Sequence, residues 1–492
     1  MNVIRDLRDY LKVSEDLGVL KKIEGADPEL EIGALSDLYR RRKSTLFDKI
    51  KGFPAGHRVF SNIFAVDKQQ KALLGVPLEA TTLDFVRQVK RKMVEFRSIK
   101  PIEVSRGPVM ENVMKGPDVD LLKFPTPRWH EVDGGRYIGT ADSVITRDPE
   151  SGWVNLGTYR VMLQDKNTTG CYMSPGRHGR FMREKYWQKG QNCPVAVVVG
   201  NDPLLFTMSQ TSVPQGISEY EFAGWLRGEA IQVVKGPYTG LPIPASAEIV
   251  LEGEILPPEK ESRSEGPFGE WTGYYASGSR NEPVIHVKTV LYRNDPILTG
   301  VSSGLVPSEV RGNIIRAATL WSQLEAAGVP GINGVWYMEP GGSYLLIAIS
   351  IKQGFPGHAM QAGLAAAGCR EGSYLNRFTI VVDDDIDPTN ENDVWWAMAS
   401  RCDPKTSIEV VNNCWASPLD PRLEPTKRAA GDFSSSRAII NACKPYHWMK
   451  DFPRVVNTSS ELAEKVIAKY KNILGDLSTE DLLRASRSKV VM

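Results

Sequence analysis

Two glutamates on either side of a short turn could carry acid–base chemistry. Glu265 and Glu270 flank the sequence Gly-Pro-Phe-Gly, and an aromatic run follows. A regular strand would place them on opposite faces, whereas a turn rich in glycine and proline can direct both carboxyls into one cavity. Two carboxyls in an apolar pocket repel and are poorly solvated, so one tends to keep its proton near neutral pH. A general acid requires that state. On these residues alone, an exposed turn whose glutamates meet water is the commoner alternative.

Three residues nearer the N-terminus, Asn155, His178 and Glu219, are candidate ligands for a hard divalent cation. An amide oxygen, an imidazole and a carboxylate form an incomplete, oxygen-rich set that suits magnesium or manganese completed by water and phosphate. Simpler explanations exist: His178 as an exposed histidine in a loop, and Glu219 as a first-turn helix carboxylate favoured by the dipole. The sequence does not show that the three converge.

Other charged residues are weaker candidates for binding a substrate, a phosphate or a metal. Arg160 lies five positions after Asn155 and could hold a substrate carboxylate or one of the two glutamates through a forked ion pair, although a surface arginine is the default. Residues 170–180 form a Gly-rich basic segment, predicted to be a flexible loop that can hold phosphate. That segment matches no Walker or dinucleotide fingerprint. The triplet from Asp383 to Asp385 could bind metal, yet acidic residues at a strand end commonly need no ligand.

The composition argues against several classes of protein. For 492 residues, two or three domains are expected. The chain is 41% hydrophobic and 24% charged with a formal charge of +1, so neither nucleic acid nor a membrane surface is indicated as a partner. There is no signal-peptide pattern and no apolar run of about 20 residues. Six scattered cysteines without a Cys-x-x-Cys pair are typical of reduced, mostly buried thiols in a cytoplasmic protein.

Changes in hydrophobic pattern predict three domains, at residues 1–115, 116–312 and 313–492. The first is a mixed αβ domain with an apolar helical stripe over residues 7–17, a second helix over 29–41 and a strand over 57–64. In the middle domain, residues 137–145 and 153–164 flank a turn signal and should form a hairpin. Further strands are predicted at 195–199, 248–255 and 284–292, and a helix capped by Ser218 at 218–229. Strands outnumber helices, which predicts a barrel or sandwich-like domain.

The last domain alternates helices at 313–327, 358–367 and 392–401 with strands at 344–351 and 378–382, which favours an α/β layer. Near the end, Thr458 and Glu461 match a capping box before an amphipathic helix that reaches Leu474. Such a helix can fold back on the chain or dock on a partner subunit. We therefore expect a homodimer or a higher homo-oligomer.

Together these residues resemble the UbiD-type decarboxylases, which use prenylated FMN. The likeness runs through most of the chain and follows the family's order: Asn155-x4-Arg160, Arg177-His178, Ser218-Glu-Tyr-Glu-Phe-Ala-Gly224, Ala245-Ser-Ala-Glu-Ile-Val250, Glu265-Gly-Pro-Phe-Gly-Glu270 and Phe378-Thr-Ile-Val-Val-Asp-Asp-Asp385. The resemblance implies an α+β fold with an N-terminal αβ domain, a central split β-barrel of the flavin-reductase type that holds the flavin, and a C-terminal αβ domain used in oligomerisation.

By this resemblance, manganese would be held against the flavin phosphate by Asn155, His178 and Glu219. Arg160, Glu265 and Glu270 match the family's catalytic set, with Glu270 as the proton donor. A potassium ion would lie near the backbone of residues 209–211. The positions that would line the cofactor are Thr158, Tyr159, Arg160, Tyr172, Met173, Ser174, Arg177 and Arg377. The family often has lysine at the last of these, so the geometry of a phosphate contact there would differ.

The function implied is reversible, non-oxidative decarboxylation of an aromatic, heteroaromatic or α,β-unsaturated carboxylic acid. Prenylated FMN, made by a flavin prenyltransferase, would act as the electron sink. A carboxylase that runs the same chemistry in reverse, and a flavin-binding protein without decarboxylase activity, stay open as alternatives. The complete Arg160, Glu265 and Glu270 set argues against cofactor storage, and the lack of a nicotinamide fingerprint argues against a reductase. Residues around His447 and Trp448 are expected to contribute to a substrate pocket whose acid the sequence does not identify.

Overall fold

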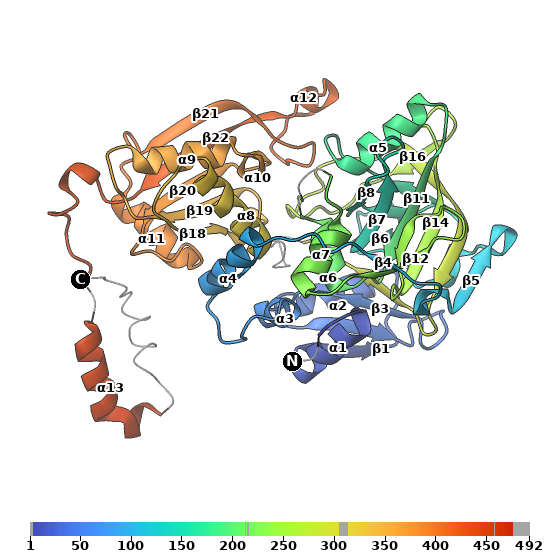
Figure 1. The fold of residues 1–492 in the computed structure, drawn as a ribbon, viewed down its shortest axis with the longest axis horizontal. Helices are drawn as coiled ribbons and strands as arrows, with labels where there is room; N and C mark the ends of the chain where they lie inside the picture. Colours follow the sequence, from blue (N-terminus) through green and yellow to red (C-terminus); the bar gives the residue numbers. More distant parts are fainter. Residues whose placement is uncertain (1–2, 212, 214–215, 305–312, 457, 476–492) are drawn as a thin grey trace. The chain divides into compact units, whose positions relative to one another are not determined.

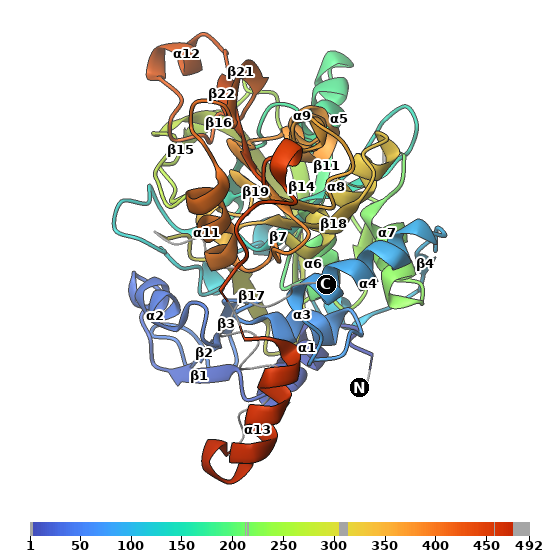
Figure 2. The same ribbon diagram turned by 90° about the vertical axis from the view of Figure 1, so that its left-hand side faces the viewer.

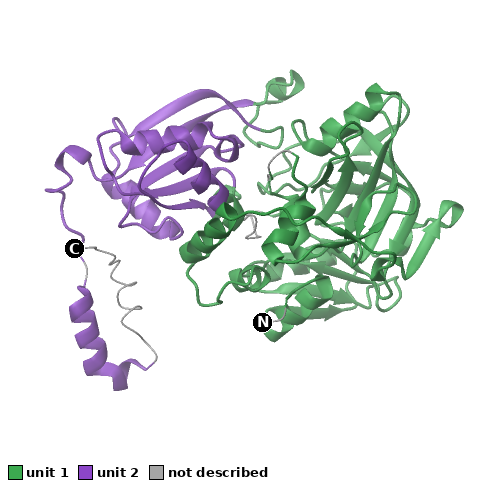
Figure 3. Ribbon diagram, in the orientation of Figure 1, with its two compact units in different colours: residues 1–316, 339–343, 417–433 green, residues 317–338, 344–416, 434–492 purple. Residues whose placement is uncertain are grey.

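The computed structural model describes residues 3–211, 213, 216–304, 313–456 and 458–475 (Figures 1 and 2). They form a mixed α+β fold with several separate sheets. Two compact units are distinguished in Figure 3, the first made of Met1–Arg316, Glu339–Ser343 and Ser417–Phe433, the second of Ala317–Met338, Tyr344–Ala416 and Ser434–Met492. The division into three domains stays a prediction, and its second boundary, at residue 312, lies outside the described residues.

A four-stranded sheet in the first unit joins distant parts of the chain. Its order is β1 (Leu20–Glu24), β2 (Ser44–Asp48), β3 (Arg58–Ser61) and β17 (Ile297–Gly300). Helix α1 (Leu7–Asp16) contacts β1, and α2 (Glu31–Tyr39) contacts β2 (Figure 1). The predicted N-terminal helices and the strand near residue 60 are therefore confirmed. Because β17 pairs with β3, a late strand completes a sheet that begins the chain (Figure 2).

The largest sheet has ten strands. Its main path runs β6 (Tyr137–Gly139), β9 (Val161–Leu163), β10 (Thr168–Cys171), β16 (Arg280–Tyr292), β14 (Ile249–Ile255), β11 (Cys193–Val199), β7 (Asp142–Arg147) and β8 (Val154–Gly157). Two further strands, β5 (Asn112–Lys115) and β15 (Ser262–Glu265), pair with β16. Within the described part of the chain no ladder joins the end strands β6 and β8, so no closed barrel is found.

Strand pairing confirms the predicted hairpin and corrects its second arm. Val144 pairs with Gly157 and Arg147 with Val154, so β7 and β8 form the hairpin around the turn at 148–152. The single strand predicted over 153–164 is wrong, because residues 158–160 leave the ladder between β8 and β9. This break follows from pairing: β8 pairs with β7, whereas β9 pairs with β6 and β10.

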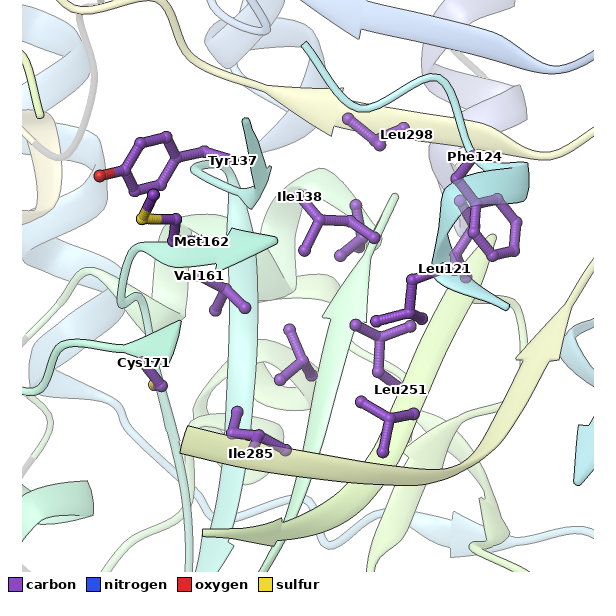
Figure 4. Close-up of a cluster of buried hydrophobic side chains, with 14 of the residues drawn as sticks. Leu121, Phe124, Tyr137, Ile138, Val161, Met162, Cys171, Leu251, Ile285 and Leu298 are labelled. Atoms are coloured by element: carbon purple, nitrogen blue, oxygen red, sulfur yellow. The ribbon is translucent and has the colours of Figure 1, made fainter. Parts of the chain in front are cut away.

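A large apolar core packs against this sheet (Figure 4). Val195, Val197 and Val199 alternate along β11 and all belong to the core, as the period of two in a strand requires. Figure 4 shows Val161, Ile285 and other side chains from several strands pointing toward one another. Burial of this apolar surface is the main driving force that holds the strands in register.

Helices cover the first unit, and one of them replaces part of a predicted loop. Besides α1 and α2, these are α3 (Asp67–Leu73), α4 (Thr82–Val94), α5 (His178–Gln188), α6 (Pro203–Ser209), α7 (Glu219–Arg227) and α12 (Pro425–Ala429). Ser218 caps α7 as expected. The flexible loop predicted over 170–180 is wrong at its end, because His178 already begins α5. A small sheet, β4 (Ile102–Glu103), β12 (Gln232–Lys235) and β13 (Pro242–Pro244), completes the unit.

The second unit has the predicted α/β character. Its sheet runs β18 (Ile332–Tyr337), β19 (Leu346–Ile351), β20 (Phe378–Asp383), β22 (Ser434–Ala442) and β21 (Ile408–Trp415). The helices are α9 (His358–Gly368), α10 (Arg370–Ser373), α11 (Glu391–Arg401), α13 (Ser460–Leu474) and, from Ala317 on, α8 (Asn313–Ala326). α9 and α11 contact β20 and β22. The predicted capping box is wrong, because Ser459 rather than Thr458 caps α13 and accepts a hydrogen bond from Leu462 N.

None of the described helices combines the length and the apolar character needed to cross a membrane. All six cysteines are free thiols, and three of them are buried: Cys171, Cys193 and Cys443.

Candidate active site

Arg160 contacts two buried glutamates at once. It directly precedes β9, while Glu265 ends β15 and Glu270 lies in the turn that follows. Arg160 Nε and Nη2 donate to the two carboxylate oxygens of Glu265 over 2.8 and 2.6 Å, and Nη1 donates to Glu270 Oε1 over 2.5 Å. All three side chains are buried. The turn thus directs both carboxyls to one guanidinium, and the forked contact with Glu265 fixes its plane.

Backbone contacts hold the Gly-Pro-Phe-Gly turn in place. Gly134 N donates to Pro267 O over 2.8 Å, and Gly269 N donates to Asp133 Oδ1 over 3.2 Å. A Cβ on Gly134 would lie 2.0 Å from the carbonyl oxygen of Gly266. Only glycine permits so close an approach of two backbone segments. Residues 133–134 therefore set the position of the turn.

Burial determines the protonation of this cluster. It raises the pKa of the Glu270 carboxyl above the ordinary 4.5, an effect that Arg160 opposes and Glu265 reinforces. Burial also disfavours the charge on Arg160, but Glu270 and Glu265 outweigh it and raise the pKa of the guanidinium. Tyr137 OH donates to Glu265 Oε1 over 3.2 Å, and burial beside this carboxylate raises the pKa of the phenol. Burial and the neighbouring Glu265 therefore favour a proton on Glu270, against the opposing charges of Arg160 and Arg280.

The three candidate metal ligands lie on elements that meet at β8. Asn155 is in β8 itself, Glu219 is the first residue of α7, and His178 is the first residue of α5. Both helices contact β8. Leu156 N donates to Glu219 Oε2 over 2.7 Å, and the His178 ring lies edge-on to Trp153 with centroids 4.9 Å apart. The fold therefore brings the three positions to one strand, while their assignment as ligands stays a prediction.

The chemistry of these residues fits a hard cation. Glu219 is buried and forms no ion pair with any described residue. Burial raises the pKa of its carboxyl to about 8, although the N–H of Leu156 lowers it in part. Asn155 Nδ2 is buried without a hydrogen-bond partner in the described ranges, and because it is a donor it suits an acceptor such as a phosphate oxygen, whereas a cation would take Oδ1. Those ranges hold no cluster of three His, Cys, Asp or Glu side chains that could bind a metal.

Thr158 and Tyr159 lie in the break between β8 and β9. Thr158 N donates to Ser209 O over 3.2 Å, at the end of α6 where a potassium ion is predicted. The Tyr159 ring is buried so close to Gly157 and Gly179 that a Cβ on either glycine would lie within 3 Å of it. Burial raises the pKa of this phenol to about 12. Tyr159 thus packs the start of α5 against the end of β8.

Further residues that are predicted to line the cofactor lie in the segment between β10 and α5. The Tyr172 ring faces Arg160, whose guanidinium carbon is 4.8 Å from the ring centroid. Met173 is buried beside it, and Arg177 N donates to Ser174 O over 3.4 Å. Arg177 occupies the N-cap position of α5. One short segment therefore connects the neighbourhood of Arg160 with the first turn of α5.

Arg377 belongs to the second compact unit, where its backbone N–H donates to Leu345 O over 2.9 Å just before β20. Its contact with a flavin phosphate stays a prediction. The same holds for substrate contacts near His447 and Trp448, which lie in that unit as well.

Three residues near the cluster were missed by sequence reasoning: Asp133, Tyr137 and Arg280. Tyr137 stood in a predicted strand, but no pattern of spacing indicates that its hydroxyl meets Glu265. Asp133 contacts the turn across more than a hundred residues of chain. Arg280 is the cross-strand partner of Glu265, so recognising a β15–β16 hairpin would have found it.

Comparison with known proteins covers nearly the whole chain. Three family descriptions match: the 3-octaprenyl-4-hydroxybenzoate carboxy-lyase N-terminal domain at residues 11–89, its Rift-related domain at 100–305 and its C-terminal domain at 310–442. A phenolic acid decarboxylase of Streptomyces sp. (strain D7) is 33% identical over 454 residues, covering 89% of this chain and 92% of the relative. A pyrrole-2-carboxylic acid decarboxylase of Pseudomonas aeruginosa is 32% identical, covering 85% and 87%.

Solved structures agree with this relationship. The UbiD-class enzyme HmfF from Pelotomaculum thermopropionicum, in complex with FMN, superposes with a TM-score of 0.82 at 28% identity over 94% of this chain and 100% of that one. The vanillic acid decarboxylase of Sedimentibacter hydroxybenzoicus in its closed form gives 0.81 at 29% identity over 97% and 100%. The chain therefore belongs to the UbiD family, named after 3-octaprenyl-4-hydroxybenzoate carboxy-lyase.

Proposed function

We propose that this protein is a prenylated-FMN-dependent carboxy-lyase that catalyses reversible, non-oxidative decarboxylation of an aromatic, heteroaromatic or α,β-unsaturated carboxylic acid. The observation that carries the proposal is the buried cluster in which Arg160 contacts both Glu265 and Glu270. Relatives named as phenolic acid and pyrrole-2-carboxylic acid decarboxylases support it. Two similar structures are named as complexes with FMN and with prFMN.

Arg160 is suited to orient the carboxylate that leaves. Its side chain is already desolvated and held in one plane by Glu265, so little reorganisation is needed when a substrate binds. Each terminal nitrogen of a guanidinium carries two N–H groups. The contacts with Glu265 and Glu270 therefore leave N–H groups for a substrate carboxylate.

Glu270 is suited to supply the proton. Loss of carbon dioxide leaves an electron pair on an sp² carbon, and prenylated FMN, when bound, supplies the electron sink that no side chain offers. Glu270, kept neutral by burial, donates its proton to the carbon that carried the carboxylate. It is left as a carboxylate beside Arg160, and a proton from solvent restores the acid. In the reverse direction the same residue removes that proton.

The residues around β8 would hold the cofactor. Asn155, His178 and Glu219 would bind manganese, whose charge would compensate the buried Glu219 carboxylate and the flavin phosphate. Backbone oxygens at residues 209–211 would bind potassium. The residues that would line the flavin are Thr158, Tyr159, Arg160, Tyr172, Met173, Ser174 and Arg177, with Arg377 as a further phosphate contact. Within the described residues, the buried Glu219 carboxylate lacks an ion pair, which supports a bound cation, and the Asn155 amide nitrogen lacks an acceptor, which supports a phosphate oxygen beside it.

The proposal extends to the architecture. We infer that the ten-stranded sheet corresponds to the family's split barrel, and that residues 1–115, 116–312 and 313–492 act as three domains. We further infer a cytoplasmic homodimer or higher homo-oligomer that obtains its cofactor from a flavin prenyltransferase. One structural neighbour is itself named as a dimeric form.

Co-expression with a flavin prenyltransferase tests the proposed function. The purified protein should carry a flavin with the mass and absorption of prenylated FMN, together with manganese by elemental analysis. It should release carbon dioxide from at least one member of a panel of phenolic, heteroaromatic and acrylic acids. Protein loaded with the cofactor that neither decarboxylates any acid nor exchanges the ring proton of the product would instead support a flavin-binding role. Faster net reaction in bicarbonate with the decarboxylated compound would favour a carboxylase.

A further inference from the structure

Trp153 connects the three elements that carry the proposed metal ligands. It directly precedes β8 and lies two residues before Asn155. Its indole ring lies edge-on to the His178 ring, with the two centroids 4.9 Å apart. Its Nε1 donates a hydrogen bond over 3.2 Å to the carbonyl oxygen of Ile217, two residues before Glu219. A side chain outside the proposed ligand set therefore contacts one ligand directly and the backbone beside another.

The same ring forms part of the wall of a cavity. This cavity has a volume of about 880 Å³, and its lining residues include Trp153, His178, Phe181, Ser218 and Tyr220. Asn155 and Glu219 are buried, so His178 is the proposed ligand that meets this space. A histidine side chain beside a cavity has more room to leave its rotamer than one that is packed on every side. The contact with Trp153 restricts that freedom.

The hydrogen bond from Trp153 to Ile217 acts on a second proposed ligand. Ser218 follows Ile217 and caps α7, so the backbone of these two residues fixes where the helix begins. Glu219 is the first residue of α7, and its Oε2 accepts a hydrogen bond from Leu156 N over 2.7 Å. Contacts from β8 and from the residue before it therefore restrain both the side chain of Glu219 and the backbone that precedes it. A ligand binds a metal ion well when contacts of this kind fix its position before the ion arrives.

We propose that Trp153 is a positioning residue for the metal and flavin-phosphate site: its ring holds the His178 imidazole in place, and its indole N–H fixes the start of the helix that carries Glu219. This inference rests on the proposed function, because the ligand set is part of that proposal. The role of Trp153 concerns affinity for the cofactor rather than proton transfer. Contacts that orient a metal ligand typically change metal affinity by about 10- to 100-fold, and a loss of that size is expected when both contacts are removed.

Titration of FMN into the full-length, metal-free protein, with MnCl₂ or with EDTA, tests the proposal without turnover. Calorimetry gives the dissociation constant of FMN in wild type, Trp153→Leu and Trp153→Phe. Manganese should strengthen FMN binding to wild type, because the cation would bridge the phosphate and the ligand side chains. Trp153→Leu keeps apolar bulk but removes both contacts, so FMN affinity in manganese should fall by about 10- to 100-fold, with little change in EDTA. Trp153→Phe keeps an aromatic ring and loses the N–H, so its loss should stay below about tenfold and should again require manganese.

Trp187→Leu is the matched control. Trp187 is a partly exposed tryptophan of α5, and its indole N–H also donates to a backbone carbonyl over 3.2 Å, that of Ile255. Its ring packs on Arg183, whose guanidinium carbon is 4.3 Å from the ring centroid, rather than on a proposed ligand. This variant should leave the effect of manganese on FMN affinity unchanged.

Equal losses of FMN affinity in manganese and in EDTA for Trp153→Leu would overturn the inference, because they would mean that the ring only supports the fold. Wild-type affinity in both Trp153 variants would overturn it as well. If circular dichroism shows that Trp153→Leu does not fold, Trp153→Phe carries the test: a loss confined to manganese supports the inference, and no loss, or an equal one in EDTA, overturns it. A wild type whose FMN affinity does not respond to manganese would instead refute the metal assignment in the proposed function, and this inference with it, so the two failures are distinguishable.

Discussion

Arg160 contacts two buried carboxyls, and its unequal contacts give the two glutamates different surroundings. Glu265 takes the bidentate contact and a hydrogen bond from Tyr137. A second ionised carboxylate would leave excess negative charge in a poorly solvated site, which is unfavourable. Glu270, with a single contact to Arg160, therefore keeps its proton more easily. In the proposed mechanism Glu265 anchors the arginine and Glu270 is the acid.

Replacing Glu270 by glutamine should remove the acid while keeping its shape. We expect turnover to fall by about 10²–10⁴-fold, while substrate still binds through Arg160. The sharper measurement is exchange: product incubated in D₂O with wild-type enzyme should take up deuterium at the former carboxyl position, and with Glu270→Gln it should not. Glu261→Gln, a partly exposed glutamate paired with Arg263, is the control. Exchange at the wild-type rate in Glu270→Gln would assign the proton to Glu265 or to water.

If Glu270 is the acid, kcat should depend on pH. Glu270 must be protonated to act as the acid, and burial raises its pKa above 4.5. The active form therefore persists above pH 4.5 and is lost as the pH rises through the raised pKa. The rate of the protonation step should then decline by about tenfold per pH unit. A profile of kcat against pH checks this, and the falling limb should be absent in Glu270→Gln. An identical limb in that variant would place the titration elsewhere.

Glu219 offers a test of the metal site. Glu219→Ala removes a buried carboxylate that has no ion-pair partner among the described residues, so manganese content and flavin occupancy should both fall well below wild type. Glu221→Ala is a matched control, since Glu221 lies in the same first turn of α7 but bonds to Ser98. Elemental analysis and the flavin absorption measure the outcome. Full metal and flavin in Glu219→Ala would show that the ligand assignment is wrong.

At the scale of single residues, the sequence indicates which side chains could do chemistry, but it does not indicate which residues contact them. The turn composition permitted the hypothesis that Glu265 and Glu270 point into one site, although an exposed turn was the commoner alternative, and the family resemblance was needed to favour the first. Nothing local indicates that Tyr137 or Asp133 supports them, since those contacts arise from strand register and chain crossing. Arg280 was missed for the same reason.

Among the structural elements, the turn after β15 depends most on a single glycine. A Cβ on Gly134 would lie 2.0 Å from Gly266 O, so Gly134→Ala must displace the turn that carries Glu270. A displacement of about 1 Å can cost on the order of 10²-fold in rate, and we expect a loss of that size with the fold retained. Gly278→Ala is the control, because a Cβ at that position would have no other atom within 4 Å. Circular dichroism and kcat check both variants, and wild-type activity in Gly134→Ala would refute the argument.

The elements that sequence reasoning found are those with strong local signals. Ser218 caps α7, and the turn at 148–152 joins β7 to β8, because capping and turn chemistry act within a few residues. Helix α5 was missed because it begins inside a glycine-rich basic segment whose composition favours a loop. The break between β8 and β9 was missed because only long-range pairing reveals it.

At the scale of the whole molecule, one compact unit contains every proposed catalytic residue. Arg160, Glu265 and Glu270 all lie in the first unit, which also carries the ten-stranded sheet and its core. The second unit contains Arg377, which only the family resemblance assigns to the cofactor. The catalytic cluster therefore depends on the long-range pairing that builds the large sheet, and mutations that loosen its core should disturb the cluster as well.

The exposed apolar side chains of the last helix, α13, lead us to expect an oligomer. In α13 only Ala463 is buried, while Leu462, Tyr470 and Ile473 are 52%, 41% and 80% exposed. Tyr470 departs from helical dihedrals within α13, and the described residues leave the apolar side chains on both sides of it exposed, so these would gain stability by docking on another copy. We expect light scattering to give a multiple of the 54.6 kDa chain mass. The double variant Leu462→Ser, Ile473→Ser should shift the protein toward one chain mass.

Val94→Ser is the matched control for that variant, since Val94 is 76% exposed but lies on α4 rather than on α13. Because it removes a comparable exposed side chain, it separates loss of an interface from a general effect on solubility. The two serines should lower the mass only if α13 contributes apolar surface to the contact. A wild-type protein that is a monodisperse monomer would show that the exposed side chains of α13 have no partner copy, and an oligomer unaffected by the double variant would place the interface on another element.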